Sequence, residues 1–552
     1  MNLLDIISQQ EKVQQWHQGF SGNFRQLITG LNASAKTLVM ASALNGWQKK
    51  ILVIAPSLYQ MNQLAEDLAN FLGEEKVFTY PVNEVLAAEM AIASPESASE
   101  RIRTLDFLID EEAEGIVVAT VGATRKFLPS VATWQAAHFN WNVGDEVDFD
   151  HLAQNLVLMG YTNNTMVEAP GEFTMRGSIL DVFPLTFKHP VRIEFFDVEI
   201  DSIREFDEIT QRSLDNLENV VIPPANEYVF SAENLAIGAD KLQEEFEKKL
   251  SVTTDEELKK VIQGHFDEVL TDLRQGIPGN YKHYYTDFLY QHKTSLFDYF
   301  NPSSLVFVDD YARIQEMNRQ ISIEEAQWQT MKLEEGKVFS NQNFGMEFSV
   351  LIKNLKQQST FFSLFQKGMG GLRFGLVHNF TSHQMQQFFG QMPLVKAEVD
   401  RWRKLGYTVV LLADNEERQS KLENLLHDWD IQATLVQNSA LLENQTQITI
   451  GQAQTGFEFI DAKLIVLSEK DMFNRKTKKR PRRSLMSNAE RLKSYNELNV
   501  GDFVVHANHG IGKYIGMETI ALDGVHQDYM TILYQNDDKL FIPVTQLSMI
   551  SK

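Results

Sequence analysis

The chain has 552 residues, and its 74 Asp and Glu against 51 Lys and Arg give a formal net charge of −23. It contains no cysteine, which excludes disulfides and thiolate metal sites. So acidic a chain is not a nucleic-acid-binding protein throughout, because such footprints are basic. With no run of about 18 apolar residues and no secretory signal, we expect a soluble cytoplasmic protein that makes no membrane contact.

The first motif is Gly30-Leu-Asn-Ala-Ser-Ala-Lys-Thr37, a phosphate-binding loop in which Ala35 replaces the second glycine. A strand at 25–29 and a helix at 36–46 are predicted to flank it. Glycine lets the backbone approach phosphate oxygens closely, so Ala35 predicts a loop that has lost its nucleotide. Lys36 and Thr37 could still reach phosphates and Mg²⁺, and weak nucleotide binding remains the alternative.

Strands and helices alternate around this loop. Strands are predicted at 51–56, 77–80 and 115–120, and helices at 58–72 and from Pro95 onward. This alternation predicts a degenerate phosphate-loop α/β domain with a parallel sheet over residues 1–145. The strand Val306–Val308 is expected to return to that sheet. Asp309 and Asp310, which follow it, have the form of a Mg²⁺-holding acidic pair, with a solvated strand end as the alternative.

The rest of the chain predicts further domains, about four in all at roughly 150 residues each. Residues 146–225 are predicted to form an inserted α+β domain, and 226–350 a helical segment with helices at 233–249 and 254–275. Residues 351–473 are predicted to form a second α/β domain, with strands at 408–412 and 464–467, a helix at 416–427 and no ligand site at the glycine-rich connection 368–371.

The end of the chain differs in composition from the rest. A linker is predicted at 474–490, because residues 475–483 hold seven Lys and Arg in nine positions. It is either a solvated linker or a nucleic-acid-binding patch. Short strands with turns near 508–510, 523–524 and 536–538 predict a small β-barrel at 491–552. The fold class is therefore multidomain α/β with a small barrel at the end.

Two blocks of sequence resemble a known family. Residues 171–184, 191–197 and 199–204 resemble domain 2 of excinuclease B and, more closely, the same domain of bacterial transcription-repair coupling factors. Residues 500–516 resemble the RNA-polymerase-interaction domain of those factors, a Tudor-like barrel. In this order, on either side of a degenerate α/β unit, the blocks resemble the amino-terminal portion of such a factor: an excinuclease-B-like module, a spacer domain and the polymerase-interaction domain.

The resemblance implies a recruitment role without catalysis by this chain. Ala35 is one departure from excinuclease B, and another is that 80–117 leave no room for its long damaged-DNA-clamping hairpin. The parent factor is expected to bind double-stranded DNA through an ATP- and Mg²⁺-dependent translocase of helicase superfamily 2, beyond Lys552. The rival interpretations are an active excinuclease-B-like ATPase that binds damaged DNA, and a polymerase regulator with no repair role.

The resemblance also indicates site residues. For binding of excinuclease A they are Arg176, Arg192 and Phe196; alternatively, both arginines satisfy internal carboxylates such as Asp181 and Phe196 is in the core. For the β subunit of RNA polymerase the indicated residues are Lys513, Met517, Thr519, Ile520 and Tyr529, with a barrel-core role for Ile520 as the alternative. Catalytic residues, metal ligands and a cofactor are not expected in this chain.

Overall fold

The structure is a computed structural model that describes residues 2–22, 24–82, 95–279, 281–437, 440–473, 501, 503–506, 510–522, 525–534, 539–543 and 550–551. The described residues group into two compact units. One holds the first sheet, a helical hairpin and the second α/β domain, and the other holds the inserted sheet and the last sheet. Within the described residues, no helix combines the length and the apolar character needed to cross a membrane.

A seven-stranded parallel sheet forms the centre of the first unit, with strand order β15-β1-β14-β13-β2-β4-β3. Its strands are β1 (Gln26–Thr29), β2 (Lys50–Ala55), β3 (Val77–Tyr80), β4 (Gly115–Thr120), β13 (Leu305–Asp309), β14 (Gln358–Ser363) and β15 (Leu376–Asn379). β2, β4 and β13 are apolar along their length and fully buried, as expected for strands covered on both faces. The predicted return of the chain through β13 is confirmed.

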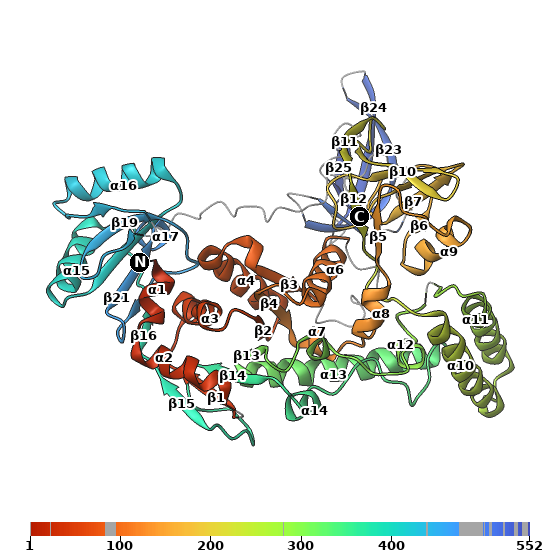
Figure 1. The fold of residues 1–552 in the computed structure, drawn as a ribbon, viewed down its shortest axis with the longest axis horizontal. Helices are drawn as coiled ribbons and strands as arrows, with labels where there is room; N and C mark the ends of the chain where they lie inside the picture. Colours follow the sequence, from red (N-terminus) through yellow and green to blue (C-terminus); the bar gives the residue numbers. More distant parts are fainter. Residues whose placement is uncertain are drawn as a thin grey trace. The chain divides into compact units, whose positions relative to one another are not determined.

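Helices cover both faces of this sheet (Figure 1). α3 (Ala33–Trp47) and α4 (Leu58–Leu72) share one apolar core with α1 (Leu3–Ser8) and α2 (Glu11–Gln18). α13 (Tyr311–Glu334) lies on the opposite face, where the ring of Tyr311 contacts Phe361. Phe362, one residue further along β14, contacts Trp16 of α2 instead. The alternation of neighbouring side chains along β14 therefore ties both helical layers to one strand.

The predicted helical segment forms an antiparallel hairpin of α10 (Ala232–Val252) and α11 (Glu256–Arg274). Ser231 and Asp255 cap these helices by accepting backbone N–H groups of the first turns. The hairpin packs around Phe246 and Phe266. Helices α6 (Pro95–Ile109), α7 (Val121–Arg125), α8 (Val131–Ala136), α12 (Thr286–Leu289) and α14 (Phe348–Lys353) complete this part of the unit, with α9 (Phe149–Leu158).

The second α/β domain has a mixed sheet of order β16-β20-β21-β17-β19-β18. Its elements are β16 (Ser382–Gln384), α15 (Met392–Lys404), β17 (Thr408–Ala413), α16 (Glu416–Asp428), β18 (Thr434–Leu435), β19 (Thr446–Ile450), β20 (Phe457–Phe459), β21 (Leu464–Ser468) and α17 (Glu469–Phe473). The predicted strands and helix of this domain are confirmed. Its predicted start at residue 351 is wrong, because β14 and β15 pair in parallel with β1 of the first sheet.

The second unit contains an antiparallel sheet and a second sheet that is antiparallel except for β6, which pairs in parallel with β7. The inserted sheet has the order β11-β10-β9-β8-β7-β6, formed by β6 (Thr162–Asn163), β7 (Glu172–Arg176), β8 (Ile179–Val182), β9 (Val191–Phe196), β10 (Glu199–Phe206) and β11 (Ser213–Leu217). The last sheet has the order β25-β24-β23-β22-β26, formed by β22 (Phe503–His506), β23 (Gly510–Leu522), β24 (Val525–Leu533), β25 (Lys539–Pro543) and β26 (Ile550–Ser551). Its closure into a barrel stays a prediction. The predicted turns fall on residues outside the described ones, apart from Gly510, which begins β23.

Candidate functional site

The predicted phosphate loop lies between the end of β1 and the first turn of α3. Gly30 has a φ of +83°, and α3 begins at Ala33, three residues before the predicted start at Lys36. The N–H groups of Ala35 and Lys36 donate to the carbonyl of Asn32 at 3.1 and 3.3 Å. Ala33 has a φ of +42°, so the helical hydrogen bonds start from the Asn32 carbonyl although Ala33 itself lies outside helical dihedrals. Two backbone donors that a phosphate loop presents to its ligand are therefore used inside the helix.

The mouth of this loop is covered by the chain that leads into the second α/β domain. Ser382 donates its N–H to the Gly30 carbonyl at 3.1 Å, and its hydroxyl oxygen accepts the N–H of Asn32 at 2.9 Å. The Asn32 amide donates to the Ser382 carbonyl, also at 2.9 Å. A Cβ on Gly30 would lie only 1.9 Å from the carbonyl oxygen of Phe380. Protein groups therefore lie directly against the loop.

The charged residues of the predicted nucleotide site bind one another. Lys36 Nζ lies 2.5 Å from Asp309 Oδ1, and the Asp309 side chain is almost fully buried. Asp310 has a φ of +57°, and its carboxylate accepts the N–H of Arg313 as the cap of α13. The Thr37 hydroxyl is buried and donates to the Ala33 carbonyl at 3.4 Å. The structure brings these residues together but leaves each one engaged within the protein.

Asp67 of α4 is a buried residue of this region that the sequence analysis missed. It is only 2% exposed, and burial raises its pKa to about 6 against the lowering effect of the Gln454 N–H and the hydroxyls of Ser34 and Thr37. Gln454 N–H donates to Asp67 Oδ1 at 3.0 Å, and Thr455 N–H donates to Ser34 Oγ at 3.2 Å. Asp67 thus links α3 and α4 to the second α/β domain. Its position between buried Leu64 and Leu68 was the available signal.

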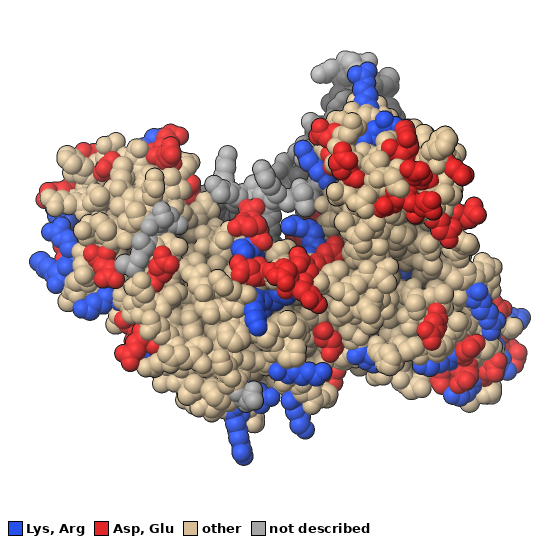
Figure 2. Space-filling view, viewed as in Figure 1, with Lys and Arg blue, Asp and Glu red and all other residues tan. Residues whose placement is uncertain are grey.

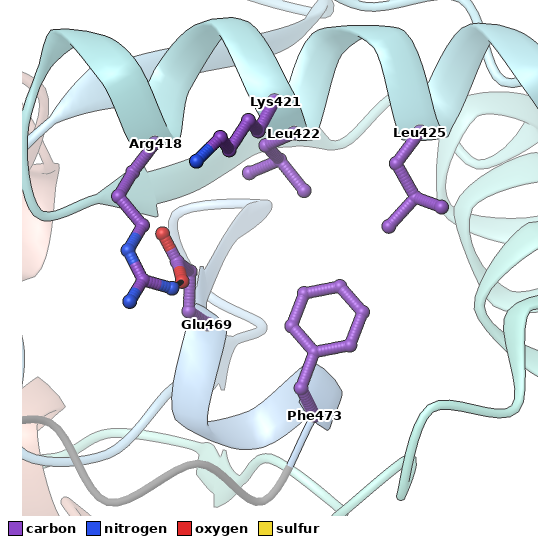
Figure 3. Close-up of a pocket in the computed structure, with 6 residues that line it drawn as sticks. All are labelled: Arg418, Lys421, Leu422, Leu425, Glu469 and Phe473. Carbon is purple, nitrogen blue, oxygen red and sulfur yellow. Dashed lines mark hydrogen bonds and ion pairs between the residues drawn. The ribbon is translucent and has the colours of Figure 1, made fainter.

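Two pockets border the second α/β domain. One, of about 120 Å³, lies between α16 and α17, where Arg418 and Lys421 face Glu469 and apolar side chains (Figure 3). Arg418 Nη1 binds Glu469 Oε2 at 2.8 Å. That volume is below the roughly 300 Å³ at which small-molecule sites begin. The other pocket, of about 380 Å³, is lined by the carboxylates of Glu66, Asp414 and Glu469, which oppose phosphate binding.

The three residues predicted for excinuclease A lie on one face of the inserted sheet. Arg192 is directly opposite Asp181 in the register of β8 and β9, and Phe196 follows on the same face of β9. Asp181 is fully buried and accepts Arg192 Nε at 2.6 Å, Arg192 Nη2 at 2.8 Å and Arg176 Nη2 at 2.8 Å. This hydrogen bonding raises the pKa of Arg192. Both arginines do satisfy Asp181, the alternative that the sequence left open.

The same residues differ in exposure. Phe196 is 78% exposed, whereas its neighbour Phe195 is 5% exposed, so Phe196 is not in the core. The side chain of Arg176 is 49% exposed and that of Arg192 is 17% exposed. Ile209 is a further exposed residue, at 78%, that the sequence analysis missed. Its loop contacts the same face, because Gln211 Oε1 accepts Arg192 Nη2 at 3.3 Å.

The residues predicted for polymerase binding lie on β23 and β24. Lys513 is exposed. Met517, Thr519, Ile520 and Tyr529 are placed as strand positions, but their side chains lie outside the described ones. β22 pairs with β23 only as far as Lys513. The Tyr514 carbonyl accepts the N–H of Gly501 at 2.8 Å. Among the described residues, the edge of β23 from residue 515 to 522 pairs with no strand on the side of β22.

Comparison with known proteins follows this division of the chain. Family models match for the UvrB interaction domain at residues 139–228, the MFD D3 domain at 403–472 and the CarD-like/TRCF RID domain at 498–552. A transcription-repair-coupling factor of Bacillus subtilis (strain 168) is 38% identical over 537 residues, which cover 97% of this chain and 45% of the relative. One of Staphylococcus aureus (strain MRSA252) is 33% identical over 563 residues, covering 100% and 47%.

The chain is similar to transcription-repair-coupling factors along nearly its whole length, and three family models match within it. It spans about half the length of the curated relatives that it matches. In this family frame, the UvrB interaction domain encloses the Arg176, Arg192 and Phe196 face, and the RID match encloses the open edge of β23. The D3 match begins within α15, which agrees with the later start of the second α/β domain found in the structure.

Proposed function

We propose that this chain is the recruitment and regulatory part of a transcription-repair-coupling factor. The domain at 498–552 would bind RNA polymerase stalled at a DNA lesion, through its β subunit. The inserted domain would recruit excinuclease A for nucleotide excision repair. The remainder of the factor would supply the ATP- and Mg²⁺-dependent translocase that acts on double-stranded DNA and releases the polymerase. The cytoplasm, where bacterial transcription takes place, would be its location.

One observation carries the excinuclease assignment: an exposed aromatic ring on the same sheet face as two hydrogen-bonded arginines. Phe196 is 78% exposed, and Arg192, four residues earlier on β9, and Arg176 both bind buried Asp181 on that face. Aromatic and arginine side chains dominate the energetics of many interfaces, and a preorganised pair loses little entropy on binding. Asp181 and Arg192 position the face, while Phe196 and the half-exposed Arg176 are the side chains available for contact.

The test is capture of excinuclease A by immobilised chain. Phe196→Ala combined with Arg176→Ala should abolish capture while leaving the fold intact, because the exposed ring packs little within the protein. A control changes another exposed Phe and a half-exposed Arg in the second α/β domain, Phe389→Ala with Arg401→Ala. Unchanged capture by a folded Phe196/Arg176 double variant would reject the assignment.

The polymerase assignment is supported by the unpaired edge of β23. An open strand edge offers backbone N–H and C=O groups to an added strand, and neighbouring side chains select the partner. Ile520 lies in this segment, opposite Gln527 of β24. Ile520→Arg should remove binding to polymerase. A folded variant that still binds would refute this contact.

The predicted phosphate loop at residues 30–37 suggested the rival function, an excinuclease-B-like ATPase, but its contacts in the structure argue against it. Lys36 is neutralised by Asp309, Asp310 caps a helix, and Ser382 and Thr455 lie against the loop. We therefore propose that this chain does not hydrolyse ATP. Calorimetric titration with Mg-ATP should give no binding heat, and micromolar affinity would restore the rival function.

A further inference from the structure

Two long stretches of this acidic chain contain no acidic residue. Residues 12–65 and 348–397 include neither Asp nor Glu, although the whole chain has 74 of them. The stretches are more than 280 residues apart in sequence. The fold places them side by side, because β1 from the first stretch pairs with β14 and β15 from the second. The outer end of the seven-stranded sheet is therefore free of carboxylates from its own strands.

Four cations surround the amino ends of these strands. Arg25 Nη2 donates to the Ile352 carbonyl at 3.1 Å, which places Lys353 beside it. The N–H of Gly375 donates to the Arg25 carbonyl at 2.9 Å, which brings the chain at Arg373 to the same edge. Lys356 lies two residues before β14. We call Arg25, Lys353, Lys356 and Arg373 the basic edge.

The basic edge is accessible and uncompensated. Lys353, Lys356 and Arg373 are exposed, and within the described part of the chain none of the four cations has an ion-pair partner. Figure 2 shows Lys and Arg side chains projecting from the lower margin of the view, where β1, β14 and α14 lie in Figure 1. The acidic residue nearest in sequence is Glu347, before the first residue of α14, roughly 9 Å of helix from Lys353.

Apolar side chains accompany these cations. Phe24 is 39% exposed and packs against Gly375, where an added Cβ would lie 2.7 Å from the phenylalanine side chain. Aromatic rings among cations are typical of surfaces that stack unpaired bases of single strands. Phe24 therefore does not bear on duplex binding, for which the cations are the relevant groups. Leu376 and Val377 are also partly exposed on the edge strand β15. Exposed apolar side chains there favour binding of a peptide rather than of nucleic acid.

We propose that the basic edge binds the phosphate backbone of duplex DNA without reading its sequence. Unpaired cations gain most from a dense row of phosphates, and binding releases the counterions condensed on the DNA. The net charge of the chain does not prevent this, because exposed charges beyond roughly 8 Å are largely screened at physiological ionic strength. This surface would be a second DNA-binding site, in addition to the ATP-dependent translocase of the proposed function.

The test measures anisotropy of a fluorescein-labelled 30-base-pair duplex with the whole chain at 50 and 150 mM NaCl. Four contacts predict a log–log salt slope of about −3.6, since each phosphate contact contributes about 0.9. Lys353→Glu with Arg373→Glu should weaken binding at least tenfold and lower the slope by about 2. The control, Lys248→Glu with Lys260→Glu on α10 and α11, carries the same change in net charge and should alter affinity less than twofold.

Equal weakening by both pairs of substitutions would overturn the proposal, because net charge alone would then account for it. Absence of DNA binding at 50 mM NaCl would also overturn it. If the wild type but not the Lys353/Arg373 variant were then retained on an acidic-peptide resin, the basic edge would be a protein-binding surface. The assay contains neither polymerase nor excinuclease A, so its failure would leave the recruitment function untouched.

Discussion

Removing the charge of Asp67 should stabilise the first unit at neutral pH. Burial raises the pKa of Asp67 from 3.8 to about 6, so its ionised form is disfavoured in the folded chain. The shift of about two pKa units corresponds to roughly 3 kcal/mol of unfolding free energy. Because the folded pKa is the higher one, this stability is fully present below pH 3.8 and is lost as the pH rises through 6. Asp67→Asn keeps an acceptor for the Gln454 N–H and avoids that loss.

The assay is the first unfolding transition in urea, followed by tryptophan fluorescence between pH 4.5 and 7.5. The advantage of Asp67→Asn over the wild type should grow by at most about 1.4 kcal/mol per pH unit up to pH 6 and then level off. Glu66→Gln removes the same charge from the adjacent, exposed position of α4. Because Glu66 is the smallest of the causes that act on the pKa of Asp67, this variant should show a much weaker trend. A difference that does not vary with pH, or a variant less stable than the wild type at pH 7, would refute the reasoning.

Two further pairs of substitutions test the packing. Gly30→Ala places a Cβ 1.9 Å from the Phe380 carbonyl at a φ of +83° and should destabilise by at least about 2 kcal/mol in thermal unfolding, whereas Gly264→Ala in open space on α11 should stabilise by about 0.5–1 kcal/mol. The opposite order would contradict the covered loop. Asp181→Ala removes the buried acceptor of two partly exposed arginines and should cost about 2–3 kcal/mol in urea unfolding, against less than about 0.5 kcal/mol for Phe196→Ala. Equal costs would refute the assigned division between positioning and contact residues.

The sequence predicted the elements well where apolar patterning is strong. β2, β4, β13 and β17 are fully buried apolar strands, and such runs leave little freedom of assignment. The start of α3 was wrong because the motif was expected to hold the loop open as far as Lys36. In the structure the N–H groups of Ala35 and Lys36 already bind the Asn32 carbonyl, so α3 begins at Ala33.

Long-range contacts could not be read from the sequence. Nothing local in residues 358–363 indicates that they pair with β1 more than 300 residues earlier, so the domain start at 351 was misplaced. The contacts of Ser382 and Thr455 with the loop also join residues more than 300 positions apart, so no local pattern indicates them. For the inserted domain the sequence left two roles open for the arginines. The structure shows both binding Asp181, with Phe196 exposed on the same face of the sheet.

Sequential capture on a biosensor tests most directly whether this chain binds RNA polymerase and excinuclease A at the same time. RNA polymerase is immobilised, this chain is added, and excinuclease A follows. The account expects a second mass increase when excinuclease A arrives, and expects the Arg176→Ala, Phe196→Ala variant to give only the first. No second increase with the wild type, although each partner binds the chain alone, would contradict recruitment through this chain.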